Sequence, residues 1–286
     1  MLWIKWLGIV VGSFAVPVIA LATYGAMRWA DATRALHFRL EAARMAPAPV
    51  CYDSRELDGL PAPAQRFFRA VLTDGQPMIA AATVLHTGTF NMGESAEQWK
   101  AFTSTQRVIT RQPGFVWDGR VAVLPGLNVH VHDAYVAGEG ILHPTILGVF
   151  TLVEMRGTGD VASGELMRWL AETAWYPTAL LPSQGVRWEP VDERPARATL
   201  KDGPHVLTMT FTFGDDGLLR SGRDEARGRT VGKEIVMSPW EGRWSNYQVH
   251  DGMRVPMSGE VAWLLPEGRK PYWRGTISSL RYEFAR

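Results

Sequence analysis

The chain contains one cysteine, Cys51, and none of the short motifs that mark common catalytic sites. A single thiol excludes an internal disulfide and any cysteine-based zinc site. There is no G-x-S-x-G elbow, H-E-x-x-H helix or Walker A loop, and no G-x-G-x-x-G turn that leads from a strand into a helix. No such motif places a base beside Ser183, which we expect to be a turn residue. The sequence therefore names no reaction.

The chain also has little net charge. Thirty basic residues oppose 29 acidic ones, which leaves a net charge of +1, and the basic residues form no cluster. This balance excludes a strong electrostatic attraction to nucleic acid. Tryptophan, glycine and proline are plentiful, with 12, 28 and 18 residues. Together with only 21% charged residues, they are typical of a folded, turn-rich domain with an aromatic core.

Residues 6–27 contain no Asp, Glu, Lys or Arg. A helix of 22 such residues is long enough to cross the ~30 Å hydrocarbon core of a bilayer. Trp3 and Trp6 at one end, and Tyr24 and Trp29 at the other, lie where interfacial aromatic residues are usual. We therefore expect a transmembrane helix, with the bilayer as a partner. A buried core helix is the alternative.

The same run also resembles a cleaved secretory signal, because Lys5 gives a short basic start and residues 20–22 form an A-x-A cleavage site. Two features of the sequence favour opposite sides of the membrane for the domain. The positive-inside rule favours a cytoplasmic domain, since four arginines follow the run: Arg28, Arg34, Arg39 and Arg44. The signal-like start and the fold resemblance described below favour a single-pass protein with an extracytoplasmic domain, which is the location we expect.

Helix formers continue over residues 28–45, a segment that we interpret as a juxtamembrane helical stalk. Its apolar residues fall near one helical face: Trp29, Leu36, Leu40 and Ala43. The prolines of residues 46–50 then break the helix. We thus predict three parts, an anchor and stalk over residues 1–45, a linker over 46–56 and a β-rich domain over 57–286.

The β-rich domain shows strand patterns separated by turn signals. In residues 207–213, apolar side chains alternate with threonines, as in a strand with one buried face. Asp-Gly pairs at 118–119, 202–203, 216–217 and 251–252 are typical of hairpin turns. Further strands are predicted at 82–92, 99–110, 114–124, 128–137, 186–192, 196–201, 218–227, 230–237, 243–250, 258–265 and 272–284. About a dozen antiparallel strands require a sheet that curls or closes.

Two helices are predicted within the domain. Residues 60–72 begin with prolines suited to a first turn and place their apolar residues at helical spacing. Residues 163–175 lack strand alternation, and Ser163 is a plausible N-cap. The apolar stripe of the second helix is Leu166, Leu170 and Ala174. Its charged residues Glu165, Arg168 and Glu172 are spaced to pair with one another.

The order of these elements resembles the lipoprotein-carrier (LolA/LolB-like) superfamily. The resemblance rests on the leading helix, on GFVWDGR (114–120), on the helical interruption and on TFTFGDDGLLRSGRDEARGR (210–229). It implies a mainly β fold with few helices, in which a curled antiparallel sheet or open half-barrel has an apolar concave face covered by a helix.

The chain also resembles a family of uncharacterised, membrane-associated bacterial proteins over residues 57–284. Its strings include LPAPAQRFFR (60–69), DAYVAGEG (133–140), GELMRWLAE (164–172), YPTALLPSQGVRW (176–188) and PYWRG (271–275). From these strings we expect four polar residues to matter to whatever the domain binds: Arg120, Asp133, Glu139 and Arg168.

If the half-barrel forms, inward-facing aromatic and thioether side chains suit an acyl chain. The candidates to line it are Trp117, Trp188, Trp240, Trp263, Met209, Phe211 and Phe213. The alternative is that these side chains pack against the helix of residues 163–175 as a closed core.

Two other site interpretations are weaker. His130 and His132 share a strand face and could bind a metal with Asp133 or His143, but histidines on a solvated strand face are commoner, so we expect no metal and no cofactor. Glu139, Glu165 or Glu172 could serve as general acid and base near Arg120 or Arg187, although helix ion pairs also explain Glu165 and Glu172. The charged residues 220–229 are interpreted as a water-facing strand.

The leading hypothesis is therefore a membrane-anchored protein that binds or shields an apolar ligand, a lipid or an acyl chain, without catalysis. The alternative is a hydrolase that uses a carboxylate pair or a histidine-bound metal on the same scaffold.

Overall fold

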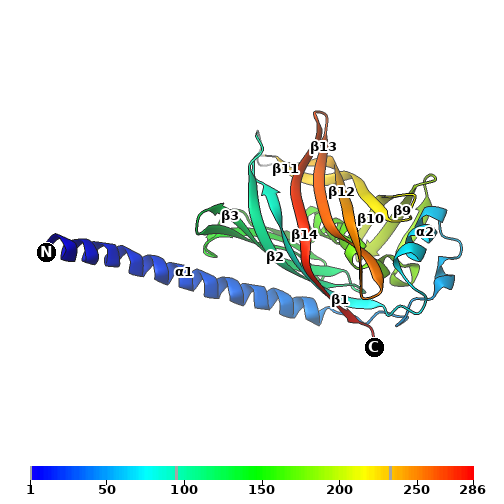
Figure 1. Ribbon diagram of the computed structural model, residues 1–286, viewed down its shortest axis with the longest axis horizontal. Coiled ribbons are helices and arrows are strands. Elements are labelled where there is room, and N and C mark those ends of the chain that lie inside the picture. Colours follow the sequence, from blue (N-terminus) through cyan, green and yellow to red (C-terminus); the bar gives the residue numbers. More distant parts are fainter. Residues whose placement is uncertain (1, 94–95, 232–233) are drawn as a thin grey trace.

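The computed structural model describes the backbone of residues 2–93, 96–231 and 234–286 (Figure 1). The side chains of residues 2–15, Thr230 and Glu234 lie outside the description. The helices are α1 (Leu2–Ala42), α2 (Ala62–Val71) and α3 (Asp160–Glu172), with short 3-10 turns at Ser54–Leu57, Thr173–Trp175, Pro177–Leu180 and Pro182–Gln184.

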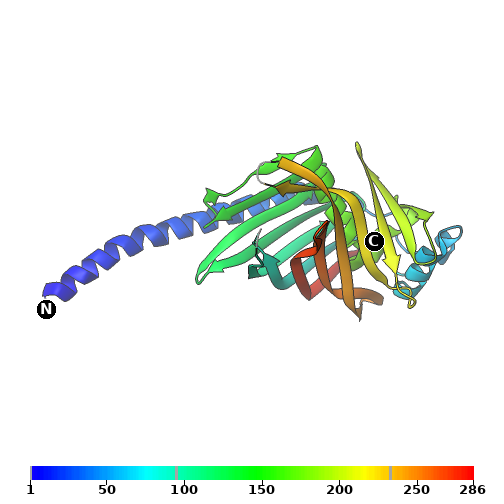
Figure 2. The same ribbon diagram turned by 90° about the horizontal axis from the view of Figure 1, so that it is seen from above.

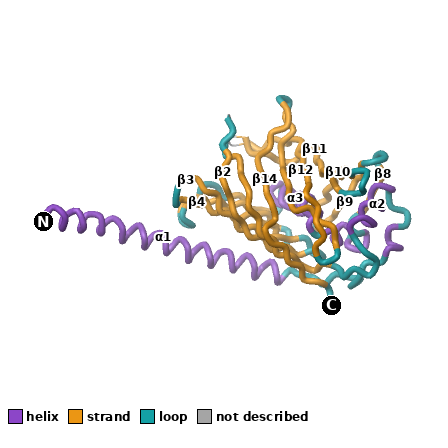
Figure 3. The backbone as a smooth tube through the Cα atoms, viewed as in Figure 1, coloured by secondary structure: helices purple, strands orange, loops and turns teal. Residues whose placement is uncertain are grey.

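The remaining elements form one 14-stranded antiparallel sheet, drawn in orange in Figure 3. Its strands are β1 (Ile79–Asn91), β2 (Trp99–Ile109), β3 (Gly114–Leu124), β4 (Leu127–Val136), β5 (Glu139–Ile146), β6 (Phe150–Thr151), β7 (Met155–Gly157), β8 (Arg187–Pro190), β9 (Pro195–Asp202), β10 (His205–Phe213), β11 (Leu219–Val231), β12 (Glu234–His250), β13 (Met253–Leu265) and β14 (Gly268–Phe284).

The sheet order is β6-β5-β4-β3-β2-β1-β14-β13-β12-β11-β10-β9-β8, with β7 paired to β5. Neighbours along this path are neighbours in sequence, except that the first strand, β1, pairs with the last, β14. The sheet curls strongly but does not close, because β6 and β8 end the path at opposite edges (Figures 1 and 2). The predicted curled antiparallel architecture is confirmed.

Three details of the strand prediction are wrong. Strand β5 was not predicted, and the segments 230–237 and 243–250 belong mainly to one long strand, β12, with residues 232–233 outside the description. Asp118 and Gly119 form no turn but lie inside β3. The Asp-Gly pairs at 202–203, 216–217 and 251–252 do lie in turns.

Helix α3 lies on the concave face and contacts strands from both halves of the curl, β3–β5 and β10–β11. Its predicted apolar stripe is buried, with Leu166 and Leu170 at 0% exposure. The predicted start is wrong, since Gly159 is the N-cap and the Ser163 hydroxyl instead hydrogen-bonds His205 Nδ1 at 2.8 Å. The N–H of the Trp169 indole donates to the Ile109 carbonyl oxygen at 3.1 Å, which joins the helix to the end of β2.

Helix α1 lies on the opposite, convex face. Its first half projects away from the sheet, and its second half runs along β2–β4 (Figure 2). Leu36 and Leu40 are buried there in a small second core with Ile109 and Val116. Gly25 allows the close approach, because a Cβ atom at this position would lie 1.9 Å from the carbonyl oxygen of Leu147.

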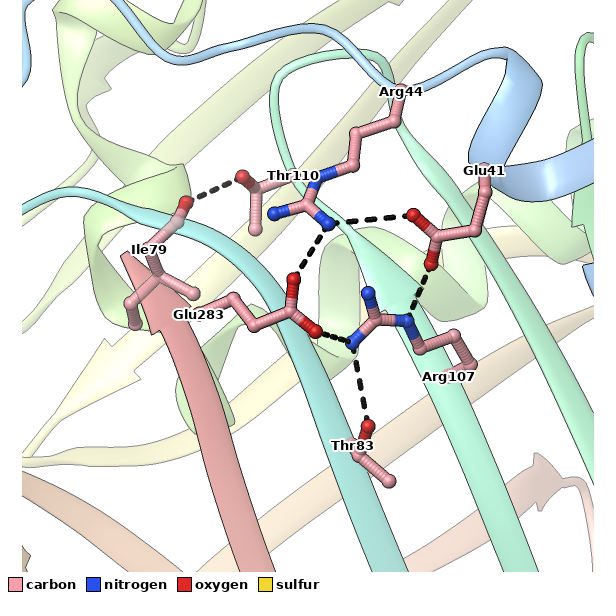
Figure 4. Close-up of polar contacts among 7 residues, drawn as sticks. All are labelled: Glu41, Arg44, Ile79, Thr83, Arg107, Thr110 and Glu283. Atoms are coloured by element: carbon pink, nitrogen blue, oxygen red, sulfur yellow. Dashed lines mark hydrogen bonds and ion pairs between the residues drawn. The ribbon is translucent and has the colours of Figure 1, made fainter. Parts of the chain in front are cut away.

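The C-terminal end of α1 is joined to the sheet by ion pairs (Figure 4). Arg107 of β2 pairs with Glu41 of α1 and with Glu283 of β14, each at 2.7 Å. Arg44, just beyond α1, pairs with Glu283 at 2.6 Å and with Glu41 at 3.3 Å. Two arginines and two glutamates thus alternate around a ring that connects three segments of the chain.

Among the described residues, no helix combines the length and the apolarity needed to cross a membrane. The predicted span over residues 6–27 begins with residues 6–15, whose side chains lie outside the description. The membrane span therefore stays a prediction.

Candidate functional site

A cavity of about 400 Å³ lies between the concave face of the sheet and the C-terminal half of α3. Strands β1, β3–β5 and β11–β14 contribute to its wall, together with Trp175 in the 3-10 turn after α3. Most of the lining is aromatic or aliphatic: Phe90, Trp117, Val121, Val129, Val131, Leu142, Trp175, Trp240, Trp244, Val261, Tyr272 and Trp273. A concave apolar site of this size is typical of a small-molecule binding pocket.

A W-x-G triplet recurs on three strands that build this wall. Residues two apart on a strand face the same side, so each tryptophan ring can lie over its glycine. A Cβ atom at Gly119 would be 2.0 Å from the Trp117 ring, and one at Gly275 would be 2.2 Å from the Trp273 ring. The three pairs are Trp117–Gly119, Trp240–Gly242 and Trp273–Gly275. Glycine therefore provides the space in which indole rings lie flat against the sheet.

The polar part of the wall centres on Arg168 of α3. Its guanidinium donates to Asp133 Oδ2 at 2.6 Å, to Glu172 Oε1 at 2.7 Å and to Gln106 Oε1 at 3.2 Å. Gln106 in turn donates to the other carboxylate oxygen of Glu172. Every side of this guanidinium thus has an acceptor from the protein.

The charge of Arg168 is stable in this buried position. Its guanidinium lies 4.8 Å from the centre of the Phe115 ring and 5.4 Å from that of Trp117, within cation–π range. Burial alone would lower the pKa of Arg168, but the carboxylates of Glu172 and Asp133 raise it overall. Arg168 therefore stays charged beside the apolar cavity.

Glu165, one helical turn before Arg168, has a strongly shifted pKa. Burial raises the pKa of its carboxyl well above the usual value, and the charge of Asp133 together with a hydrogen bond to it raises it further. The neutral form of the Glu165 carboxyl is therefore favoured in this position.

A second arginine, Arg227 of β11, also lines the cavity. Its guanidinium lies 5.0 Å from the centre of the Trp240 ring. Among the described residues it makes no hydrogen bond or ion pair. The interpretation of residues 220–229 as a water-facing strand is wrong here, because a register shift between Asp224 and Arg227 changes which side chains face inward.

The family of this chain follows from comparison with known sequences. A family model described as "Family of unknown function (DUF6920)" matches residues 58–282. The chain belongs to the DUF6920 family. A search of curated proteins found no match.

Solved structures agree with the DUF6920 fold only loosely. A LolA superfamily protein from Nitrosomonas europaea is 10% identical, with a TM-score of 0.42, and the match covers 78% of this chain and 92% of that one. A beta-barrel-like protein of the DUF1849 family from Brucella abortus is 9% identical, with a TM-score of 0.24, over 72% of this chain and 99% of that one. The family model confirms the predicted resemblance to an uncharacterised family.

Four of the predicted site residues of this DUF6920 chain meet at the cavity: Trp117, Asp133, Arg168 and Trp240. Arg120 does not, because it is exposed on the opposite face of β3 from Trp117. Glu139 lies on the convex side, where it pairs with Arg39 of α1 at 2.6 Å and with Arg156 at 3.7 Å. The structure therefore places these two residues away from the cavity.

The other predicted aromatic and thioether residues lie in the closed core or at its edge. Trp188 packs against Phe211 at 5.8 Å and edge-on against Phe68 of α2 at 6.0 Å. Met209 and Phe213 are buried in the same core, at 1% and 2% exposure. Trp263 is partly buried and stacks on Tyr272 at 5.7 Å. Both interpretations of the aromatic residues therefore hold, each for a different part of the molecule. Trp117 and Trp240 line the cavity, whereas Trp188, Met209, Phe211 and Phe213 belong to the closed core.

The histidines that suggested a metal surround an indole instead. His132 stacks on Trp29 of α1 at 3.7 Å, and His130 packs against the same ring edge-on at 5.3 Å. His143 hydrogen-bonds Thr151 at 3.1 Å. Across the part of the chain that the structure describes, no group of three or more His, Cys, Asp or Glu side chains could hold a metal ion.

The carboxylates that suggested a hydrolase are held by structural contacts. Glu172 and Asp133 are bound to Arg168, and burial raises the pKa of Glu165 well above its usual value. Arg187 is exposed and pairs with Glu189 at 3.2 Å.

Several lining residues were missed at the sequence level, notably Trp175, Trp244, Tyr272, Trp273 and Arg227. A signal for one of them was present, because the W-x-G triplet that contains Trp273 repeats the triplet around Trp117. Arg227 had no such signal, since its inward position depends on the strand irregularity after Asp224.

Proposed function

We propose that this protein binds the apolar chain of a lipid, or a similar hydrophobic small molecule, in the cavity under α3. The observation that carries the proposal is the wall of the cavity, where aromatic and aliphatic side chains surround about 400 Å³ of unfilled space. Filling the apolar part of this cavity with a hydrocarbon chain is favourable because it restores lost dispersion contacts.

The volume of the cavity matches that of one hydrocarbon chain. A methylene group occupies a volume similar to that of a water molecule in the liquid, ~30 Å³. The cavity therefore has room for roughly a dozen carbon atoms. The tryptophan rings over Gly119 and Gly275 give it flat, rigid walls. A single saturated chain or a compact polycyclic molecule fits these walls.

Binding of dodecanol to the full chain tests the proposal, with tryptophan fluorescence and native mass spectrometry as readouts. The variant Val131→Trp fills the cavity from β4 and should abolish binding. The matched control is Val206→Trp on β10, whose side chain is 61% exposed, and it should bind as the parent does. A parent protein that binds no dodecanol, or a Val131→Trp variant that binds it equally well, would contradict the proposal.

We also propose that the N-terminal helix places this domain beside a bilayer, as a single-pass anchor with the domain on the extracytoplasmic side. The uncharged residues 6–27 support this, as does the extension of α1 beyond the sheet (Figure 1). Charging the exposed positions Val16 and Ile19 together, as Val16→Glu and Ile19→Glu, should move the full chain from the membrane to the soluble fraction.

Phe38→Glu is the control for this experiment, because Phe38 is 78% exposed on the half of α1 that packs on the sheet. This variant should stay with the membrane. A parent chain found entirely in the soluble fraction would refute the anchor and leave the cavity proposal untouched.

A further inference from the structure

We propose that the ligand is an amphiphile with an anionic head group, a carboxylate or a phosphate, which Arg227 binds at the polar end of the cavity. This inference rests on the proposed function and specifies the chemical class of the ligand. It predicts that the protein distinguishes ligands with the same apolar chain by the charge of their head group.

The argument begins with the contrast between Arg227 and the other two arginines of the cavity wall, Arg168 and Arg243. Arg243 pairs with Glu241 at 2.7 Å. The guanidinium of Arg168 has three acceptors from the protein, namely Asp133, Glu172 and Gln106. Arg227 has no acceptor among the described residues, although it lines the same cavity. A guanidinium carries five N–H donors and cannot lose its charge in a protein. Arg227 is therefore the group whose hydrogen bonds are left for a ligand.

The surroundings of Arg227 hold it in place without using its donors. The Trp240 ring lies under the guanidinium at 5.0 Å, and the N–H of this indole donates to the Tyr272 hydroxyl at 2.8 Å. A cation–π contact engages the face of the guanidinium and leaves its N–H edge free. That edge matches the two oxygens of a carboxylate or a phosphate in a bidentate arrangement.

A second arginine lies two residues further along β11. Arg229 lies over Trp263 at 6.0 Å, and its Nε atom is buried with no hydrogen-bond partner among the described residues. Trp263 stacks on Tyr272, so the two arginines lie above one continuous aromatic shelf. Two positive charges on this side attract an anion. The acidic groups of the cavity wall are already paired, Asp133 and Glu172 with Arg168 and Glu260 with Arg269 and Arg274.

The closing experiment compares three ligands with the same twelve-carbon chain, namely dodecanoate, dodecanol and dodecylammonium, in titrations of the full chain at about pH 8, where the carboxylate is ionised. A hydrogen bond to a charged group leads us to expect that dodecanoate binds about ten-fold or more tightly than dodecanol. Dodecylammonium should bind most weakly. Dodecyl phosphate, as a fourth ligand, distinguishes the phosphate from the carboxylate head group.

Variants then assign the effect to Arg227. Arg227→Gln should remove the preference for dodecanoate over dodecanol while dodecanol still binds, and Arg227→Lys should keep part of it. Arg223→Gln is the matched control, because Arg223 is on the same strand but exposed and paired with Glu225. Should Arg227→Gln fail to fold, Arg229→Gln and the ligand series on the parent protein decide the question.

The outcomes separate this inference from the proposed function. If none of the three ligands binds the parent protein, the proposed function fails. If dodecanol binds as tightly as dodecanoate, or if dodecylammonium binds tightest, the cavity takes apolar chains but the anionic head group is refuted. A preference for dodecanoate that persists in both Arg227→Gln and Arg229→Gln overturns the assignment to these arginines.

Discussion

The indole ring of Trp29 in α1 stacks face to face on the imidazole of His132 in β4, with ring centres 3.7 Å apart and planes 8° from parallel. Both residues also have polar contacts across the same junction. His132 Nε2 lies 2.7 Å from the Thr33 hydroxyl, and the Trp29 indole N–H donates to Asp118 Oδ1 at 3.0 Å. Aromatic stacking and hydrogen bonds therefore fix the middle of α1 on the convex face of the sheet.

This junction should make the stability of the protein depend on pH. Burial, together with the neighbouring His143, His37 and His130, lowers the pKa of His132 to about 3. The unfolded chain takes up the proton near pH 6.5, so it binds more protons than the folded protein between pH 6.5 and 3. The free energy of unfolding should therefore fall as the pH is lowered through this window, by about 1.4 kcal/mol per pH unit for this group.

Urea unfolding between about pH 7 and pH 4 measures this dependence. His86 on the inner face contributes in the same direction, since burial and Arg168 lower its pKa to about 3. The variant His132→Asn should reduce the slope to the part that His86 and the other histidines supply. A slope that is unchanged in His132→Asn would show that His132 is not responsible.

The glycines beneath the tryptophan rings should be intolerant of even one methyl group. In Gly119→Ala the new Cβ atom would lie 2.0 Å from the Trp117 ring, so the indole must move into the cavity or the strand must shift. Overpacking of this kind costs about 1–3 kcal/mol. Thermal unfolding should show a lowered Tm, and binding of dodecanol should weaken.

Gly164→Ala serves as the control for this prediction. A Cβ atom at Gly164 would meet nothing within 4 Å, and the residue lies within α3, where alanine is favoured over glycine by up to ~1 kcal/mol. This variant should be neutral or slightly stabilised. Equal losses of stability in the two variants would argue against the steric explanation.

Removing the guanidinium of Arg168 should destabilise the fold strongly. Arg168→Ala leaves the carboxylates of Asp133 and Glu172 buried without their cation, which typically costs about 3–5 kcal/mol. Arg187→Ala breaks an exposed pair with Glu189 and should cost at most ~1 kcal/mol. Denaturant titrations of the two variants measure both losses.

The sequence predicted the architecture better than the cavity, and the reason is physical. Alternation in residues 207–213 reports that one strand face is buried, and that holds for β10, where Met209 and Phe211 are 1% and 0% exposed. Alternation cannot report whether a buried face meets a side chain or an empty space. Trp188 and Trp240 therefore had the same signal, although one lies in the closed core and the other lines the cavity.

Local irregularities account for the remaining errors. Strand β5 contains Pro144, whose missing N–H is unusual within a sheet, so its pattern did not predict a strand. The shift between Asp224 and Arg227 reverses the alternation of β11, and this depends on how the strand pairs with β12, which the residue pattern of β11 alone does not report. An Asp-Gly pair also occurs where a glycine leaves space for a neighbouring aromatic ring and not for a turn. Gly119 is such a case, because the Trp117 ring lies over it.

The ring of charges at the end of α1 gives a final prediction, since Arg107 joins this helix to two strands (Figure 4). Its side chain is 14% exposed and pairs with Glu41 and Glu283. Arg107→Met should loosen the last turns of α1, so limited proteolysis should cut near Arg44 faster than in the parent. In a double-mutant cycle with Glu41→Gln, the coupling free energy should be about 0.5–1 kcal/mol, because Glu41 is partly exposed. Additive effects of the two substitutions would show that the pair does not hold the helix, and its docking would then depend on its other contacts, among them Leu36, Leu40 and the stacked Trp29.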